Sequence, residues 1–408
     1  MNFAIIITIC VLLLLAYIFT ISSSKTKIPS VILLLILGWA SKHLADVFHI
    51  VIPDLNPLLP ILGSVGLVLI VLEGSLELKL NKEKLPFVRK TFITAIVPLI
   101  ITAFIIAFAF CYILEVDFKD GLINAIPLCI ISSAIAISSV GHLNAFNKEF
   151  AIYESSLSDI IGVLFFNFIV LNAVIDLNSV MHFGLQILIM IGISFVATAF
   201  LALLLSKIDH HVKFAPIALL IILIFAVSEV YHLPALIFIM FFGLIMENFD
   251  ELDKFEWIHK LKPKQLDKEV QKFKELIIEA AFLIRSLFFL LFGFLMKTED
   301  VLNPETFGIA LGISVLIYLI RAMQLTYFKV KLMPLLFIAP RGLITILLFL
   351  SIPEANRIPF VSKALIIQVI VLSALFMMIG LIFNKSDKKE NKKAADDENL
   401  RIDIDVPI

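Results

Sequence analysis

The sequence predicts an all-α polytopic membrane protein with about thirteen transmembrane helices. Of its 408 residues, 61% are hydrophobic and 16% are charged, whereas about 25% of the residues in soluble globular domains are charged. The mean hydropathy is +1.05. The apolar residues occur in runs of about 20, the length of a helix that crosses a bilayer core. Composition and run length together exclude a water-soluble globular fold.

Thirteen apolar segments are long enough to cross the membrane. The first has no basic residues before it and no small-residue cleavage site, so we interpret it as a spanning helix and not as a signal peptide. The loop 250–274 predicts a solvated helix along the membrane face, and the polar tail 385–408 is expected to be disordered. The segments are 3–22, 28–46, 58–78, 92–115, 121–143, 151–176, 182–206, 214–231, 233–249, 275–296, 305–327, 333–352 and 363–384.

Lysine and arginine are distributed unevenly between the two sides of the membrane. Loops that follow odd-numbered segments hold nineteen of them, and loops on the opposite side hold five. Because basic loops stay in the cytoplasm, the N-terminus is expected outside and the C-terminus in the cytoplasm. The chain is therefore expected to be a multi-pass protein of the cell (inner) membrane.

The two halves of the chain share a local pattern. One segment begins Ile28-Pro29 and reaches Gly38, and another begins Leu233-Pro234 and reaches Gly243 at the same interval. The two segments enter the membrane from opposite sides, which indicates two inverted six-helix repeats, a recurring architecture of secondary transporters. The transmembrane domain 1–384 would then comprise repeat one (about 1–177), a linking helix (182–206) and repeat two (about 214–384).

Two carboxylates lie five residues apart in the sixth segment. At about 100° per residue, Glu154 and Asp159 differ by about 140° around the helix, so they cannot serve one face. Glu154 can form a structural ion pair with an arginine, for which Arg321 and Arg341 are the candidates, while Asp159 points into a cavity. Ionisable residues inside a membrane are costly and by default functional. We therefore predict that Asp159 binds the transported ion.

A single buried carboxylate can couple two ions. Burial disfavours its ionised form, so it is stable with a proton or beside a cation, and each of these ligands expels the other. The predicted ion- and proton-binding residues are Asp159, Ser158, Ser155 and Ser138. Asp159 would be the transient metal ligand for transported Na⁺. A structural carboxylate, bonded to hydroxyls or backbone, stays an alternative.

Helix-breaking residues occur at corresponding places in the two halves. In the twelfth segment Pro340 and Gly342 flank Arg341, and proline removes a backbone donor and clashes with the preceding turn. The fifth segment carries serines, among them Ser132 and Ser133, that could satisfy backbone groups freed by unwinding. Paired, crossing broken helices indicate a transport site. Close helix packing on small residues is the alternative interpretation.

The other charges inside the segments also need partners. Arg285 and Glu279 are candidates for a second pair, although they are six residues apart and do not share a face. Glu73, at the inner end of the third segment, is either a gate or an interfacial residue, and the interfacial interpretation is favoured.

Taken together, these residues resemble the monovalent cation:proton antiporter superfamily, and more closely its sodium/proton exchanger family. The motifs that carry the resemblance over nearly the whole chain are Leu62 to Gly74, the interval from Glu154 to Asp159, Leu287 to Gly293, and Arg321 followed by Arg341-Gly342. The resemblance implies a dimer-forming sodium/proton antiporter-like fold, in which a dimerisation domain moves against a core domain. It also implies that Asp159 binds the ion and that Glu154 pairs with an arginine to brace the core.

Two departures from the family pattern concern the site. The residue before the ion-binding aspartate is commonly Asn in electroneutral exchangers and Asp in electrogenic ones, and here it is Ser158. The fifth segment lacks the Thr-Asp pair of many exchangers and offers serines and Ile137. A single carboxylate favours one-for-one, electroneutral exchange, with Na⁺ as the first candidate and Li⁺ or K⁺ as alternatives.

The predicted function is antiport of a monovalent cation and H⁺ by alternating access, which serves pH homeostasis. The expected partners are the cation, H⁺, membrane lipid and a second copy of the chain in a homodimer. An uncoupled channel-like conduit and a non-transporting scaffold on the same fold are the alternatives. The sequence predicts no enzyme, no cofactor and no nucleic-acid partner, because it has no histidine cluster or nucleophile–base pair and its net charge is −1.

Overall fold

Helices account for all the regular secondary structure in the residues that this computed structural model describes. These residues are 2–26, 28–49, 54–80, 84–141, 143–172, 176–207, 214–231, 233–248 and 263–383. In chain order the helices are α1 (Asn2–Thr26), α2 (Ser30–Val47), α3 (Leu58–Ser75), α4 (Leu85–Leu114), α5 (Phe118–Cys129), α6 (Ser133–Ser139), α7 (Ala145–Leu171), α8 (Leu177–Lys207), α9 (Phe214–Val230), α10 (Ala235–Glu247), α12 (Pro263–Leu295), α13 (Thr298–Val301), α14 (Pro304–Tyr327), α15 (Leu343–Leu350), the 3₁₀ helix η2 (Glu354–Asn356) and α16 (Lys363–Phe383).

The predicted all-helical, polytopic fold is confirmed. Each of the thirteen predicted segments has a helical counterpart in the described ranges, the fifth as the pair α5 and α6 and the twelfth as an irregular stretch followed by α15. Within the same ranges, nine stretches are long and apolar enough to cross a membrane. The helices α9 and α10 are also apolar but shorter.

The helix α12, which corresponds to the tenth predicted segment (275–296), is longer than the sequence predicted. In the described part of loop 250–274, where a solvated helix along the membrane face is predicted, residues 263–274 are helical and form the first turns of α12, which runs unbroken from Pro263 to Leu295. Proline at the first helical position favours a helix start, and neither glycine nor proline follows until Gly293, so nothing separates residues 263–274 from the apolar part. The rest of that loop and the tail 385–408 lie outside the described residues.

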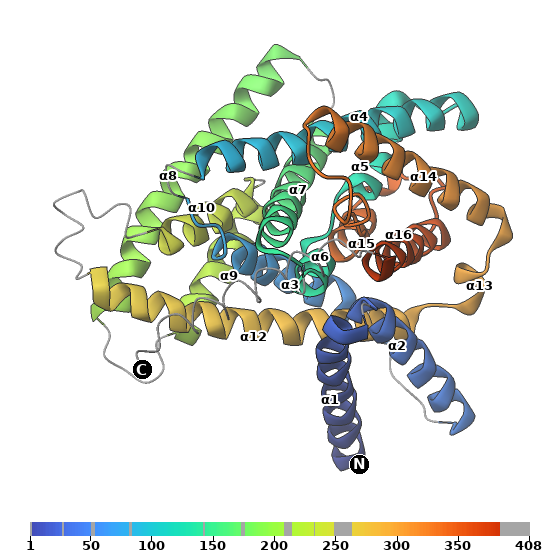
Figure 1. Ribbon diagram of the computed structural model, residues 1–408, viewed down its shortest axis with the longest axis horizontal. Coiled ribbons are helices and arrows are strands. Elements are labelled where there is room, and N and C mark those ends of the chain that lie inside the picture. The colour runs from blue at the N-terminus through green and yellow to red at the C-terminus, as the bar shows by residue number, and fades with distance from the viewer. Residues whose placement is uncertain are drawn as a thin grey trace, which may run out of the picture.

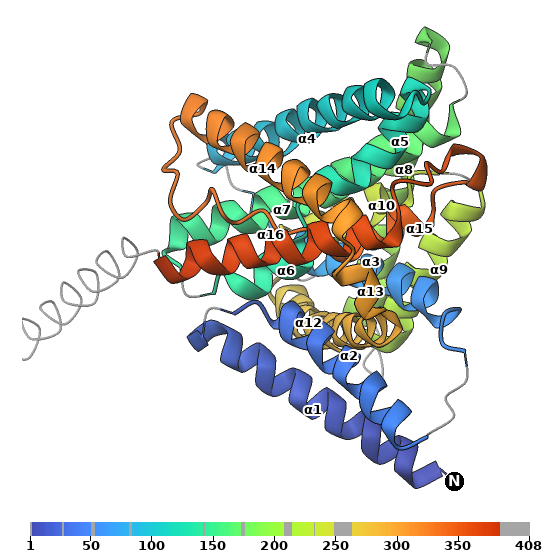
Figure 2. The ribbon, with the colours of Figure 1, turned by 90° about the vertical axis from the view of Figure 1, so that its right-hand side faces the viewer.

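The helices form two groups that meet along α3. In the first group α2 and α3 pack along α12, and α10 packs on α3 and α8. In the second group α4 and α5 pack on each other, α4, α5 and α6 each pack on α7, and α14 packs on α4 and α16. Figures 1 and 2 both show α1 and α12 on one side of the molecule and α4 and α14 on the other. We refer to them as the α12 group (α1–α3, α8–α10 and α12) and the α7 group (α4–α7 and α14–α16).

Glycines allow α2 to approach α12 closely. A Cβ atom built on Gly38 would lie 2.8 Å from the backbone nitrogen of Phe294, and one on Gly293 would lie 2.9 Å from the Cα atom of Leu35. Side chains do not approach backbone atoms this closely, so the two glycines set the spacing of the helices.

Gly38→Ala and Gly293→Ala are each expected to destabilise the protein by about 1–3 kcal/mol, because the added methyl group forces the two helices apart. The measurement is the thermal unfolding midpoint of the purified protein in detergent. Gly308→Ala on α14 is the matched control, since a Cβ atom there meets nothing within 4 Å. Equal midpoints for Gly38→Ala and Gly308→Ala would contradict this explanation of the helix spacing.

The pattern shared by the two halves has the same local role in both. Pro29 and Pro234 are the N-cap residues of α2 and α10. Gly243 of α10, like Gly38 of α2, lies at a close helix contact, where an added Cβ atom would be 2.7 Å from the Cβ atom of Ser75. The boundaries of the two repeats stay a prediction.

Candidate functional site

Two interrupted helices meet inside the α7 group. The backbone is extended between α5 and α6, with ψ of 129° at Ile130 and 115° at Ser132, and residues 338–342 are not helical. The N–H group of Ser132 donates to the carbonyl of Pro340 at 2.8 Å, so the two breaks touch. A Cβ atom on Gly342 would lie 2.8 Å from Ser132 Oγ, and glycine therefore permits the close crossing.

The backbone groups freed by the break find partners, as a dry interior requires. The N–H group of Ile131 donates to Ser158 Oγ at 3.0 Å. Arg341 donates from Nε to the carbonyl of Leu128 at 3.0 Å and from Nη2 to that of Cys129 at 3.2 Å. Arg341 thus places a positive charge at the C-terminal end of α5, where helix carbonyls carry partial negative charge.

Asp159 of α7 lies beside the first turn of α6. Its Oδ2 atom accepts hydrogen bonds from the Ser133 N–H group at 3.0 Å and from the Ser133 hydroxyl. Its Oδ1 atom has no hydrogen-bond partner among the described residues. Asp159 is 1% exposed, so the carboxyl group is closed to solvent in this conformation. Gly162 on the next turn leaves the space that the side chain of Ile130 in the break fills.

Earlier on the same helix, Glu154 forms a buried ion pair with Arg321 of α14. The guanidinium donates from Nη1 to Oε1 at 3.1 Å and from Nη2 to Oε2 at 2.7 Å, a two-pronged geometry that strengthens such pairs. Its Nε atom donates to the carbonyl of Leu335 at 2.9 Å, so the pair also holds the irregular stretch before α15. Of the two arginines considered from the sequence, Arg321 binds Glu154, while Arg341 binds backbone carbonyls.

The serines singled out from the sequence have different surroundings. Ser132, Ser133 and Ser158 lie at the crossing of the broken helices, as described above. Ser155 and Ser138 donate to carbonyls of their own helices, at 2.7 Å to Ala151 and at 3.0 Å to Ile135 respectively. The structure thus brings three of the five serines to the crossing, and the hydroxyls of the other two are engaged by the local helix backbone.

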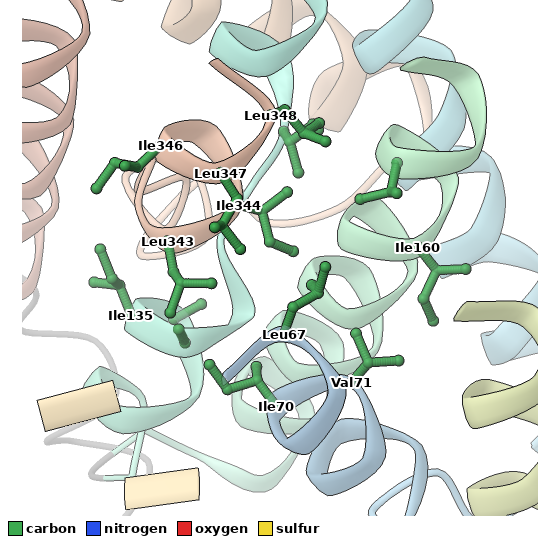
Figure 3. Packing of buried hydrophobic residues seen from close by; sticks show 14 of the residues in the cluster. Leu67, Ile70, Val71, Ile135, Ile160, Leu343, Ile344, Ile346, Leu347 and Leu348 are labelled. Carbon is green, nitrogen blue, oxygen red and sulfur yellow. The ribbon is translucent and has the colours of Figure 1, made fainter. Parts of the chain in front are cut away.

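The two sides of the crossing differ in character. Toward α4 and α14 lies a cavity of about 20 Å³ whose lining includes Ser158, Arg321 and Arg341, which is room for about one water molecule. Toward α3 the packing is apolar, and Figure 3 shows side chains of α3, α6, α7 and α15 in one cluster around Leu67 and Leu343. Outside this cluster the two helix groups also share polar contacts, since Arg285 of α12 donates to the carbonyl of Ala134 on α6 at 3.4 Å.

The second ion pair inside the helices differs from the predicted one. Arg285 Nη1 lies 3.6 Å from Oε2 of Glu73, whereas Glu279 is exposed. The interpretation of Glu73 as interfacial is wrong, because only 4% of it is exposed. The reason is that α3 packs along α12, which brings these distant residues together, and a buried carboxylate needs such a partner.

Ser133→Ala is expected to raise the KM for the transported cation about tenfold or more. The hydroxyl stabilises the ionised carboxylate of Asp159, and a hydrogen bond to a charged group contributes about 1.5–3 kcal/mol, where about 1.4 kcal/mol is tenfold in affinity. The measurement is the initial rate of exchange against cation concentration. Ser138→Ala is the matched control on the same helix, and equal KM values for the two variants would contradict the role given to Ser133.

Broken helices that cross beside a buried carboxylate, in a fold of membrane-spanning helices, define a secondary transporter. The sequence model of the family described as "Sodium/hydrogen exchanger, transmembrane" matches residues 10–385. The chain therefore belongs to the sodium/hydrogen exchanger family, which is a family of transporters and not of enzymes. Membership supports cation/proton antiport, with a cation and H⁺ as the transported species.

Solved structures of similar fold include two of the sodium proton antiporter MjNhaP1 from Methanocaldococcus jannaschii. The structure at pH 8 is 17% identical, with a TM-score of 0.65, and the match covers 93% of this chain and 97% of that chain. The structure from an electron-microscopy map is 16% identical, with a TM-score of 0.66, and the match covers 94% and 95%. At these identities the likeness shows a shared fold. The comparison with curated proteins gave no match.

Proposed function

We propose that this protein exchanges a monovalent cation, in the first place Na⁺, for H⁺, and that Asp159 binds the two in turn. The observation that carries the proposal is the buried carboxyl group of Asp159, held by Ser133 through one oxygen and without a hydrogen-bond partner in the described ranges on the other. An ionised carboxylate in such a place requires a counter-charge. A proton or a cation supplies it, and each excludes the other.

Fixed charges around the site favour one-for-one exchange. The charge of Glu154 is taken up by Arg321, and Arg341 is held by the backbone carbonyls at the end of α5. Glu154 and Arg341 keep these partners throughout the cycle, whereas Asp159 exchanges a proton for a cation. Binding of a proton and binding of a monovalent cation then give the site the same net charge, and the cycle moves no net charge. Li⁺ and K⁺ carry the same single positive charge as Na⁺ and are alternative substrates.

The closed state of the site supports a mechanism of alternating access. Because Asp159 is buried, one helix group must move for ions to reach it from either side, and the apolar contact along α3 suits such a motion. We propose that the α7 group moves against the α12 group and that the α12 group forms a homodimer. The N-terminus would lie outside and the C-terminus in the cytoplasm, with apolar helix faces such as that of α8 against lipid.

The test is transport in sealed vesicles that contain the purified protein. A proton gradient is imposed, Na⁺, Li⁺ or K⁺ is added outside, and the internal pH is followed with a fluorescent dye. Antiport predicts that the added cation dissipates the gradient, and choline chloride is the ionic-strength control. An imposed membrane potential acts on each unit charge with about 2.3 kcal/mol per 100 mV, so an electroneutral exchanger responds to pH and cation but not to potential.

The rival activities give different results in the same vesicles. A channel-like conduit would pass current without coupled proton movement, and a scaffold would leave the gradient intact with every cation. Either result would overturn the proposed exchange.

A further inference from the structure

The segment 76–80, which follows α3, is bonded to both helix groups. On the side of the α12 group, the side-chain amide of Asn248, at the end of α10, donates to the carbonyl of Leu78 at 2.8 Å. On the side of the α7 group, the hydroxyl of Tyr153 on α7 donates to the carbonyl of Lys79 at 2.8 Å. Tyr153 is 1% exposed, so water competes little for its hydroxyl. We refer to the bond from Tyr153 to Lys79, which joins the two helix groups, as the tyrosine link.

A lysine side chain joins the two helix groups at another place. Lys363, the first residue of α16, donates from Nζ to the carbonyl of Leu295, the last residue of α12, at 3.3 Å. The same Nζ atom lies 5.8 Å from the centre of the Phe292 ring, within the range of a cation–π contact. The C-terminal end of a helix favours a positive charge, whereas the N-terminal end disfavours it. The ammonium group therefore lies at the favourable end of a helix in the other group, and we refer to this bond as the lysine link.

The two links lie near opposite ends of the apolar part of α12. Glu247 of α10 forms ion pairs with Lys79 at 3.7 Å and with Lys274 of α12 at 3.4 Å, so the tyrosine link lies near Lys274. The stretch of α12 from Lys274 to Leu295 is about 30 Å long at 1.5 Å per residue, which is about the thickness of the hydrocarbon core of a bilayer. With the orientation proposed above, the tyrosine link lies at the cytoplasmic face and the lysine link at the outer face.

We propose that Tyr153 and Lys363 are positioning residues that hold the α7 group to the α12 group at opposite faces, so that opening of either face breaks one link and keeps the other. The inference rests on the proposed exchange by alternating access. Both links are formed in the structure, and Asp159 is 1% exposed, as a state that is closed on both sides requires. The relative strength of the two links then sets how often the site is open to each side.

Removal of the tyrosine link is expected to favour opening of the cytoplasmic face. Tyr153→Phe removes the hydroxyl and keeps the ring, which packs edge-on against Phe87. Loss of a hydrogen bond between uncharged groups shifts an equilibrium by about two- to tenfold. The apparent affinity for a ligand rises with the fraction of protein that is open to it. The KM for Na⁺ is therefore expected to fall by up to that factor at the cytoplasmic face and to rise at the outer face.

Removal of the lysine link is expected to have the opposite effect. Lys363→Met keeps most of the side-chain length and removes the ammonium group, so the outer face opens more readily. The KM for Na⁺ is expected to fall at the outer face and to rise at the cytoplasmic face, by about tenfold for a hydrogen bond from a charged group. The double variant Tyr153→Phe/Lys363→Met loses one link at each face, and the ratio of its two KM values is expected to return toward wild type.

The experiment uses membrane vesicles from cells that express the full-length protein, with Na⁺ as the probe. Right-side-out vesicles present the outer face to added Na⁺, everted vesicles present the cytoplasmic face, and vesicles without the protein give the background. The KM is measured in both kinds of vesicle at the same proton gradient. Tyr318→Phe is the matched control for the tyrosine, because its hydroxyl donates to the carbonyl of Ser373 within the α7 group. Lys297→Met, at an exposed position, is the control for the lysine.

The expected result is that the ratio of the outer to the cytoplasmic KM rises in Tyr153→Phe, falls in Lys363→Met and keeps the wild-type value in both controls. Shifts in the same direction, or an unchanged ratio in either variant, overturn the inference and leave the proposed function standing. Opposite shifts with exchanged signs support the two links and overturn the proposed orientation. Should one variant fail to fold, an unchanged ratio in the other overturns the inference. No exchange by wild type overturns the proposed function, and the inference with it.

Discussion

Asp159→Asn is expected to abolish cation-driven proton movement in vesicles and to leave the fold intact. Asparagine has nearly the same shape and still offers an oxygen to Ser133, but it carries no charge and no exchangeable acidic proton. A cation about 4 Å from a carboxylate gains about 4 kcal/mol at an effective dielectric constant of about 20. Loss of that attraction corresponds to a roughly thousandfold loss of cation affinity, which leaves the rate at the background of protein-free vesicles.

The matched control for this variant is Glu279→Gln on α12. It makes the same change from acid to amide at an exposed position, and exchange at the wild-type rate is expected. The thermal unfolding midpoint of Asp159→Asn should stay near that of wild type, since its bonds to Ser133 are largely kept. An Asp159→Asn protein that folds and still exchanges would assign the coupled proton to another residue.

Glu154→Gln is expected to destabilise the protein by about 3–5 kcal/mol, the cost of a buried ion pair that loses one partner. Arg321 is 2% exposed and would keep its charge in the interior without a counter-charge. The bond from Arg321 to the carbonyl of Leu335 would be strained by any movement of the guanidinium. The measurement is unfolding in detergent by heat or denaturant, with exchange recorded per folded molecule.

The double variant Glu154→Met/Arg321→Met separates charge from packing. Because it removes both charges and keeps the volume, it is expected to be less destabilised than Glu154→Gln. The difference between the double variant and the sum of the single variants gives the coupling energy of the pair. A Glu154→Gln protein with the wild-type midpoint would show that the pair does not brace the core.

Much of the fold could be predicted because a bilayer imposes simple rules on a sequence. Apolar runs of about 20 residues identify spanning helices. Because a helix has 3.6 residues per turn, the side chains of Glu154 and Asp159 point in different directions around the helix axis. In the structure Glu154 faces Arg321 and Asp159 faces α6, so these neighbours on one helix have different partners. The proline and glycine around Arg341 likewise predicted a break that the backbone shows at 338–342.

Tertiary partners could not be predicted from local pattern. Glu73 stands at the end of an apolar run, where an interfacial position is the usual outcome, and only the packing of α3 along α12 brings Arg285 to it. Serines in helices are ambiguous for another reason: their hydroxyls can bond to a carbonyl one turn earlier, as Ser138 and Ser155 do. Sequence spacing cannot distinguish such a serine from one that faces a site.

The most direct test of the central claim measures protons released when a cation binds. Purified protein in detergent and weak buffer is mixed with NaCl, with choline chloride as the control, and the pH change is recorded beside cation binding. If Asp159 holds the proton and the cation in turn, wild type releases about one proton for each cation bound, and Asp159→Asn releases none. Cation binding without proton release, or equal release by Asp159→Asn, would contradict the claim.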